Sequence, residues 1–283
     1  MSETTPPART IVVTGANAGI GKAVALQLAQ AGHHVVAVCR DDAKGRAAVA
    51  EIRAVAGPEV RVDLVLGDLS TVAGVRALAT KLLAQYHAIH VLVNNAGVWM
   101  NKRVLNADGL EMTFMVNHLA PFLLSNLLLE RLKASAPARI VNVNAGLYAM
   151  GECDLEKLPS GANFKAFKTY MHSKLCNVYF TTELARRIEG SGVTVNALHP
   201  GVIRTNLGAS QTPLGLLLKV VKRFWTEPEA GAKPVVRLAI DSELEGVSGK
   251  YFDVMKESPL APNAQDPELA KRLWNLSEKL CSI

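Results

Sequence analysis

Residues 14–21 read Thr-Gly-Ala-Asn-Ala-Gly-Ile-Gly, and this stretch decides the fold because it joins a strand-like segment to a helical one. The segment before it, residues 10–14, is short and β-branched, and residues 22–30 after it have helical composition. The three glycines permit a tight turn and a close approach of the backbone to a ligand, and the helix N-terminus supplies free N–H groups. The stretch therefore predicts a turn that binds a dinucleotide pyrophosphate, and a purely structural glycine turn is the alternative.

Beyond this turn, short β-branched segments alternate with longer amphipathic ones, which is typical of βαβ units and a parallel sheet. The expected strands are residues 10–14, 34–39, 61–66, 90–94, 139–144, 193–198 and 250–253. No linker or internal repeat interrupts the pattern. We therefore expect one doubly wound α/β domain, residues 1–283, rather than two domains.

Most of the segments expected after Thr205 are helical. The alternation stops after Thr205, and apolar residues at helical spacing in 214–225 predict a helix, which we assign to a substrate lid at residues 207–225. A last helix is expected to begin with Asp266 as its N-cap and Pro267 at its first position. The face expected to be buried consists of Leu269, Leu273, Leu276 and Leu280.

Composition limits the classes of protein that fit. The 283 residues are 49% apolar and 20% charged, which is a globular balance. The net charge of +6 permits nucleic acid, an acidic surface or a phosphorylated ligand. Like charges never form a run of five and aromatic residues are only 5% of the chain, so we expect no nucleic-acid partner. A small phosphorylated ligand fits better.

The sequence also predicts where the protein is located and whether it binds a metal. The longest apolar stretches are shorter than the roughly 20 residues of a membrane span, so no integral membrane association is expected. The polar start lacks the apolar core of a secretory signal, and we expect a cytoplasmic protein. The four cysteines are scattered without metal-ligand spacing, so neither a disulfide framework nor a metal site is expected.

The second strand ends in a basic residue. Cys39 stands where a dinucleotide site for NAD(H) would have an acid, and Arg40 follows it. A guanidinium can bind a phosphate with two hydrogen bonds, so this pattern favours NADP(H), whose ribose carries a 2′-phosphate. The alternative is a solvated Arg40 that pairs with Asp41 or Asp42.

Further motifs occur in a fixed order along the chain. They are Thr14 to Gly21, Cys39-Arg-Asp41, Asp68-Leu69, Asn94-Asn-Ala-Gly97, Asn117-His118, Tyr170-Met-His-Ser-Lys174, His199-Pro-Gly201 with Thr205, and Arg272-Leu-Trp274. Over nearly its whole length the chain thereby resembles the short-chain dehydrogenase/reductase family, and within it the retinol-dehydrogenase-like branch. The resemblance implies a seven-stranded, parallel Rossmann-type sheet with helices on both faces, a nicotinamide cofactor and carbonyl/alcohol redox chemistry.

The resemblance also implies which residues hold the cofactor. Asp68 and the Leu69 backbone would contact adenine, and the segment from Pro200 to Thr205 would hold the nicotinamide carboxamide. The implied NADP(H)-binding set is Gly15, Asn17, Ala18, Gly19, Ile20, Gly21, Arg40, Asp68, Leu69, Asn95, Ala96, Gly97, Tyr170, Lys174, Pro200, Gly201, Ile203 and Thr205. On physical grounds alone, Asn95 could equally be a buried amide that ties strands together.

Tyr170 and Lys174 are the candidate acid/base pair. They stand four residues apart on one face of the helix expected at residues 167–184. A nearby ammonium would lower the pKa of the tyrosine, which could then exchange a proton with a carbonyl or alcohol oxygen. Taken in isolation, such a pair is more often a surface contact. Asn117 resembles the family's fourth catalytic position, whereas we expect His118 to be a packing residue.

The chain departs from the family pattern at the third catalytic position. After the strand at 139–143 the family has two serines, and the second donates a hydrogen bond to the reacting oxygen. Here the residues are Asn144 and Ala145, and Ala145 stands 25 residues before Tyr170, the spacing expected in this branch. Loss of one such donor typically lowers the rate by about two to three powers of ten.

Three interpretations follow from Ala145. In the first, the chain is an NADPH-dependent carbonyl reductase in which Asn144, Tyr148 or a substrate hydroxyl replaces the donor. In the second, Tyr170 and Lys174 catalyse a cyclisation, elimination or isomerisation without net redox. The third is a catalytically disabled NADPH-binding module. Asn144 also has a purely structural interpretation, as a cap for the loop that follows the strand.

The expected substrate is a hydrophobic or polycyclic small molecule. The residues expected to face it are Trp99, Met100, Asn144, Tyr148 and Leu207. Trp99 and Met100 could instead be core residues. The oligomeric state is expected to be monomer or homodimer, because family dimers pack the helices that contain Asn117 and Tyr170, and the loop at 145–169 is long enough to cover that surface.

Overall fold

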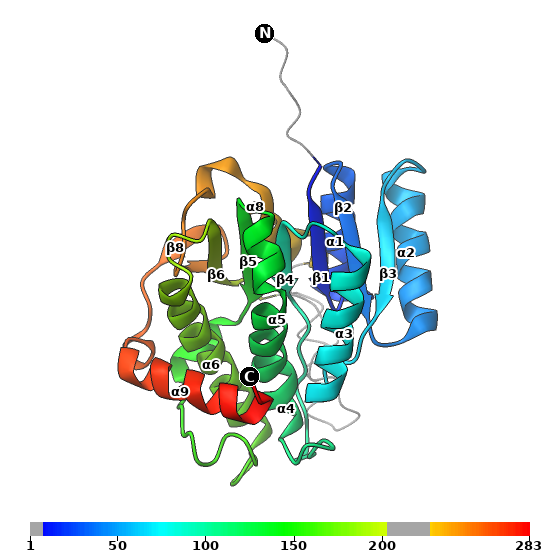
Figure 1. Ribbon diagram of the computed structural model, residues 1–283. Coiled ribbons are helices and arrows are strands. Elements are labelled where there is room, and N and C mark those ends of the chain that lie inside the picture. The colour runs from blue at the N-terminus through cyan, green and yellow to red at the C-terminus, as the bar shows by residue number, and fades with distance from the viewer. Residues whose placement is uncertain (1–7, 203–226) are drawn as a thin grey trace.

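The apolar segments form an eight-stranded sheet in the computed structural model, which describes residues 8–202 and 227–283 (Figure 1). The strands are β1 (Thr10–Thr14), β2 (His34–Cys39), β3 (Val62–Leu66), β4 (Val91–Asn94), β5 (Ala138–Val143), β6 (Val193–His199), β7 (Tyr251–Asp253) and β8 (Lys256–Ser258). Their order across the sheet is β3-β2-β1-β4-β5-β6-β7-β8. β1 to β7 pair in parallel, so the predicted doubly wound Rossmann-type sheet is confirmed.

The eighth strand is a difference from the predicted seven. β8 pairs antiparallel with β7, and its register places Tyr251 opposite Ser258 and Asp253 opposite Lys256. Its three residues, Lys256–Ser258, are polar and partly or fully exposed at the sheet edge. A strand this short carries no hydrophobic alternation, so the sequence pattern does not reveal it.

Helices cover both faces of the sheet (Figure 1). One face carries α1 (Gly19–Gln30), α2 (Asp42–Ala56) and α8 (Pro228–Ile240), and the other carries α3 (Val72–Gln85), α5 (Ala120–Ala134), α6 (Ala166–Arg187) and α9 (Pro267–Cys281). The shorter helical segments are α4 (Met112–Phe114), the π-helix η1 (Met115–Leu119), η2 (Gly146–Met150), η4 (Ser242–Leu244) and η5 (Pro262–Ala264). Side chains alternate along β1: Ile11 and Val13 pack with the first group, and Val12 with the second.

The helical run at 112–134 is central to the second layer. Among the described residues it is the one helix long and apolar enough to cross a membrane by length and composition, and 78% of that window is buried inside the fold. Phe122 and Leu128 on this run have no exposed surface. Its apolar composition is accounted for by its burial between the sheet and the neighbouring helices.

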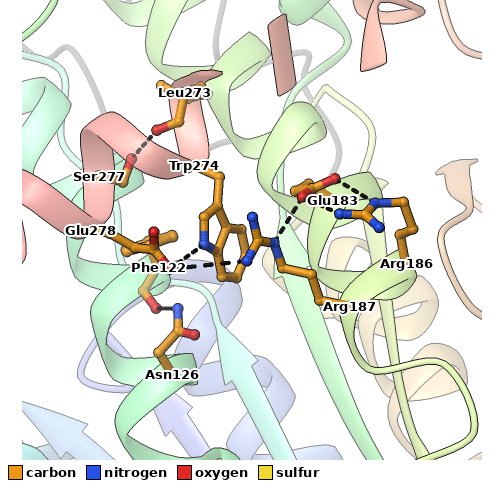
Figure 2. Close-up of polar contacts among 9 residues, drawn as sticks. All are labelled: Phe122, Asn126, Glu183, Arg186, Arg187, Leu273, Trp274, Ser277 and Glu278. Carbon is orange, nitrogen blue, oxygen red and sulfur yellow. Dashed lines mark hydrogen bonds and ion pairs between the residues drawn. The ribbon is translucent and has the colours of Figure 1, made fainter. Parts of the chain in front are cut away.

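α9 closes the second layer by docking against α6 and α5 (Figure 2). As predicted, Asp266 caps the helix, and its carboxylate accepts a hydrogen bond from Leu269 N at 3.0 Å. Trp274 packs edge-on against Phe122, with ring centroids 4.8 Å apart, and the Arg187 guanidinium lies 4.2 Å from the Trp274 ring centroid.

The buried face of α9 is rotated from the predicted leucine stripe. The buried residues are Ala270, Leu273, Trp274, Ser277 and Cys281. Leu269, Leu276 and Leu280 are only partly buried. The indole of Trp274 is the largest side chain on the helix, and its insertion against α5 turns the leucines toward the edge of the contact.

Some predictions lie outside the described residues. These are the cofactor contacts at Ile203 and Thr205, the substrate contact at Leu207 and the lid at 207–225.

Candidate active site

A cleft of about 1730 Å³ lies at the carboxyl ends of the parallel strands. It runs from the glycine turn and Arg40, past Asp68 and Leu69, to Ala145, Tyr170 and Lys174. Open α/β sheets bind ligands at this edge, beside the strands where the order reverses, here β1 and β4. Most of the predicted site residues are thereby brought together, although they range in the sequence from Gly15 to Gly201.

The glycine turn has the backbone that the sequence predicted. Gly15 and Gly19 have positive φ angles of 68° and 53°. A Cβ on Gly21 would lie 2.3 Å from the Gly15 carbonyl oxygen and 2.4 Å from Asn95 Nδ2, so only glycine fits there. No side chain that the structure describes caps the N-terminus of α1, and Ile20 and Gly21 of its first turn line the cleft. This arrangement suits a phosphate group.

Asn95 and Thr14 fix the turn to the end of β4. Thr14 Oγ1 accepts hydrogen bonds from the backbone N–H groups of Asn95 and Ala96, both at 3.0 Å. Asn95 Nδ2 donates to the carbonyl oxygen of Thr14 at 2.8 Å. The Asn95 amide thus ties two strands together, as the structural alternative predicts. Asn95 also lines the cleft, where the cofactor was expected.

Arg40 lies exposed on the cleft without a carboxylate partner among the described residues. Asp41 caps α2 by accepting a hydrogen bond from Lys44 N at 2.9 Å. Asp42 accepts two hydrogen bonds from Arg46. The alternative, in which Arg40 pairs with Asp41 or Asp42, is therefore not what the structure shows.

Tyr170 and Lys174 are both buried, and both line the cleft from the N-terminal half of α6. Lys174 Nζ donates a hydrogen bond to the Val143 carbonyl oxygen at 3.1 Å. Asn144 Nδ2 donates to the Lys174 carbonyl oxygen at 3.1 Å. The end of β5 thus holds Lys174 by its ammonium and by its backbone.

Burial shifts the pKa values of both groups. The pKa of Lys174 falls to about 8 because burial disfavours its charged form. Burial raises the pKa of the Tyr170 phenol, and the expectation that the ammonium would lower it is wrong for this structure. Lys174 Nζ lies 5.6 Å from the Tyr170 ring centroid, and the loss of water around the phenolate dominates.

Two aromatic rings cover the tyrosine. The Trp99 indole stacks on the Tyr170 ring with centroids 4.6 Å apart and an interplanar angle of 18°. Phe167, one helical turn before Tyr170, lies 5.7 Å from Trp99 by the same measure. All three residues line the cleft, so its wall here is apolar.

Asn117 lies behind the cleft rather than on it. Its Oδ1 accepts from Val98 N at 2.8 Å, and its Nδ2 donates to the Val98 carbonyl oxygen at 3.0 Å and to Ser173 Oγ at 3.1 Å. A Cβ on Gly97 would lie 3.4 Å from Asn117 Oδ1 and 3.9 Å from Lys174 Nζ. Asn117 sits in the π-helix η1, a kind of irregular helix that is frequent at functional sites.

His118, beside it, is a core residue. Its Nε2 lies 3.0 Å from Ser277 Oγ, and burial lowers its pKa to about 3. The expectation that His118 packs is consistent with this position.

Two predicted substrate residues do not reach the cleft. Tyr148 is buried on the other side of η2, where its hydroxyl accepts a hydrogen bond from Ala261 N at 3.0 Å and its ring lies 4.7 Å from Tyr251. Trp99 and Asn101 line the cleft, whereas Met100 between them does not. Asn144 and Ala145 do line the cleft.

The sequence interpretation missed several side chains of the cleft, among them Phe167 and His199. Phe167 was used only to mark the start of a helix, and His199 only as part of a motif. His199 is the last residue of β6 and lies on the cleft beside Lys174 and Gly146. The signal that could have found it is its position at the carboxyl end of a parallel strand, where such sheets place their ligands.

A family model and two known relatives place the chain in the same family. A model for the short chain dehydrogenase family matches residues 9–213. Human retinol dehydrogenase 13 is 43% identical over 297 residues, which cover 100% of this chain and 87% of that protein. Human retinol dehydrogenase 14 is 42% identical over 292 residues, covering 97% of this chain and 87% of that protein.

Solved structures agree with these relatives. An uncharacterised protein from Mycobacterium Paratuberculosis superposes with a TM-score of 0.76 at 29% identity, covering 100% of this chain and 98% of that one. A structure described as an NAD(P) dependent gluconate 5-dehydrogenase from Beutenbergia cavernae, with bound NADP at low occupancy, has a TM-score of 0.66 at 29% identity and covers 87% and 94%.

Proposed function

The chain belongs to the short-chain dehydrogenase family, and we propose that it is an NADPH-dependent oxidoreductase interconverting a carbonyl and an alcohol on a hydrophobic or polycyclic small molecule. Family membership and the retinol dehydrogenase relatives support an oxidoreductase that acts on alcohols or carbonyls and uses a nicotinamide cofactor. The observation that carries the proposal is the buried pair Tyr170 and Lys174 in the same cleft as the glycine turn.

The residues of the cleft fit a phosphorylated dinucleotide. The turn at Gly21 has no room for a Cβ, which lets the backbone approach a pyrophosphate, and Arg40 is available for a 2′-phosphate. In the proposed site, Asp68 and Leu69 contact adenine, and Lys174 binds the nicotinamide ribose. When bound, NADPH supplies the hydride. The low-occupancy NADP of the Beutenbergia cavernae structure supports the choice of cofactor.

In the proposed mechanism Tyr170 is the proton donor. Because burial raises the pKa of Tyr170, the phenol keeps its proton at neutral pH and can give it to a carbonyl oxygen that gains negative charge. Lys174 stands one helical turn away and stabilises the phenolate that results. Asn117 bonds Ser173, whose hydroxyl donates to the Tyr170 carbonyl oxygen at 2.7 Å, so it positions this turn of α6.

The expected substrate is apolar because Trp99 and Phe167 form the wall beside Tyr170. Asn144, the residue that follows β5, is one of the polar residues that line the cleft. Under this proposal the partner is a small molecule in the cytoplasm, and neither nucleic acid nor a membrane interior is a partner. The state is monomer or homodimer, and the docking of α9 on α5 and α6 supports the monomer.

Ala145 supports a second candidate. In the alignment of motifs it stands at the serine position, and its methyl group donates no hydrogen bond. A scaffold that keeps Tyr170 and Lys174 but lacks this donor could catalyse a cyclisation, elimination or isomerisation, or could be a disabled NADPH-binding module.

One experiment separates these functions. Purified protein is incubated with NADPH and a panel of apolar aldehydes and ketones, and both NADPH absorbance and product are followed. Carbonyl reduction predicts one NADPH oxidised per alcohol formed, and loss of this activity in Tyr170→Phe. Product without NADPH consumption indicates the non-redox catalyst, and NADPH binding without any product indicates the disabled module.

A further inference from the structure

His199 is a polar group of the cleft that the mechanism above does not use. It ends β6, and a Cβ on Gly146 would lie 3.4 Å from its Cδ2 and 3.8 Å from its Nε2. The ring therefore lies against the residue that follows Ala145. Its Nδ1 is buried, and the imidazole makes no hydrogen bond to any residue that the structure describes. Since Nδ1 is enclosed, the ring meets the cleft through the edge that carries Cδ2 and Nε2.

The other candidates to replace the serine donor are already engaged. Asn144 uses its Nδ2 on the Lys174 carbonyl oxygen, and its remaining polar atom, Oδ1, can only accept. The Tyr148 hydroxyl lies at Ala261, away from the cleft. Among the side chains described around Ala145, His199 keeps a ring nitrogen available on the cleft side.

The imidazole is neutral at pH 7, which leaves it one N–H donor. Burial lowers the pKa of His199; Asp253 on β7 opposes the shift, and Lys174 on α6 adds to it. With Nδ1 enclosed and unpartnered, the tautomer that carries its proton on Nε2 directs the donor toward the cleft.

We propose that His199 Nε2–H donates a hydrogen bond to the reacting oxygen and thereby takes the role of the serine hydroxyl that Ala145 lacks. This inference rests on the proposed carbonyl reduction. In that reaction the carbonyl carbon gains a hydride from NADPH, which is oxidised to NADP⁺, and the oxygen gains a proton from Tyr170. His199 keeps its proton throughout, and its hydrogen bond stabilises the charge that develops on the oxygen.

A double-mutant cycle tests the assignment. His199→Phe keeps a ring without a donor, and it is made with Ala145 present and in combination with Ala145→Ser. With Ala145 present, kcat for carbonyl reduction is expected to fall about a hundred- to a thousandfold. With the serine hydroxyl restored, the same change is expected to lower kcat less than about tenfold, because another donor is available.

Two conservative variants locate the donor on the ring. The amide nitrogen of His199→Gln reaches the position of Nε2, and that of His199→Asn reaches the position of Nδ1. We expect the glutamine variant to retain more kcat than the asparagine variant, with NADPH affinity and melting temperature matched in both. A purely structural histidine would give equal losses in both variants.

The outcomes distinguish the two proposals. If the wild type reduces carbonyls and His199→Phe lowers kcat equally with Ala145 and with serine at 145, the assignment of His199 is wrong and the reductase stands. If the wild type reduces no carbonyl, both fall, because there is no oxyanion to stabilise. Independently of turnover, a ¹⁵N NMR spectrum that shows the proton on Nδ1 overturns the assignment.

Discussion

Both halves of helix α6 carry buried ionisable side chains, but the halves differ in whether these side chains have charged partners. In the C-terminal half, Glu183 has a side chain only 4% exposed, and it accepts hydrogen bonds from Arg186 and Arg187 at 2.7–2.9 Å (Figure 2). Arg186 and Arg187 hold the pKa of Glu183 below its usual range. In the N-terminal half, burial shifts the pKa values of Tyr170 and Lys174 against their charged forms.

The C-terminal half of α6 therefore has a structural role, and the N-terminal half has a chemical one. A buried charge surrounded by partners stabilises the fold and has no reason to exchange a proton near neutral pH. A buried group with few partners has a shifted pKa, and groups with shifted pKa values cluster at functional sites. We therefore expect substitutions in the N-terminal half to change activity and substitutions in the C-terminal half to change stability.

The largest expected effect is on turnover. Tyr170→Phe removes the proton donor, and kcat/KM for carbonyl reduction should fall about 10²–10⁴-fold. The matched control is Tyr179→Phe on the same helix, which removes a hydrogen bond to the Asn263 carbonyl oxygen at 2.6 Å. The control should lose about 1 kcal/mol of unfolding free energy and keep its turnover. Equal losses of turnover in both variants would contradict the comparison.

Trp99 and Trp274, the tryptophans of the described residues, both pack against α6 and should differ in the same way. Trp274→Ala removes a buried indole from the contact with Phe122 and Arg187, and the free energy of unfolding should fall by about 3–5 kcal/mol. Urea denaturation measures this change. Trp99→Ala, at the half-buried indole on Tyr170, should lower stability less and reduce kcat more. A large loss of stability in both variants would show that Trp99 is a core residue.

The same comparison between paired and unpaired charges applies to two arginines outside α6. Arg40 has no carboxylate partner among the described residues, whereas Arg46 binds Asp42. Arg40→Ala should weaken NADPH binding about ten- to a hundredfold and leave NADH binding nearly unchanged, because only NADPH carries the 2′-phosphate. Fluorescence titration of both cofactors measures this, with Arg46→Ala as the exposed control. Equal weakening of NADPH and NADH would place Arg40 elsewhere than at the 2′-phosphate.

The smallest expected effect is the pH dependence of stability at Glu183. Because its pKa is lowered in the folded protein, its stabilisation is present at neutral pH and is lost as the pH falls below about 4. Glu183→Gln should therefore lower the unfolding free energy by about 1 kcal/mol at pH 7 and flatten its decrease in acid. The control is Glu130→Gln in an exposed ion pair with Lys133. Identical acid profiles for wild type and Glu183→Gln would refute this role.

Local patterns were sufficient for the strands and for the glycine turn. The predicted boundaries of β1 and β2 agree with the structure, β5 is shifted by one residue at both ends, and the other predicted strands differ by one residue at one end. The reason is that strands buried on both faces are continuous apolar segments, and a turn such as the one at Gly21 excludes every side chain larger than hydrogen. The spacing of Tyr170 and Lys174 placed them on one helix face, and the order of motifs along the chain identified them as an acid/base pair.

Orientation across the cleft was not available from local patterns. Tyr148 and Met100 were placed by their nearness in sequence to cleft residues, but neither lines the cleft, and the Tyr148 hydroxyl lies at Ala261. The direction in which burial shifts the pKa of Tyr170 was also predicted incorrectly, because spacing reveals the ammonium but not the loss of water. The buried face of α9 depends on where one indole inserts between α5 and α6.

The sequence by itself determined the doubly wound sheet, the phosphate-binding turn and the identities of the candidate acid/base pair. The sheet and the turn depend on hydrophobic period and glycine geometry, which act over a few residues, and the pair was identified from the order of motifs along the chain. Only the tertiary structure decided which polar groups have no partner among residues 8–202 and 227–283: Arg40 beside two engaged aspartates, and His199 against the residue that follows Ala145. Whether a buried polar group finds a hydrogen-bond or charge partner depends on side chains that distant strands bring beside it, and no local sequence pattern contains that information.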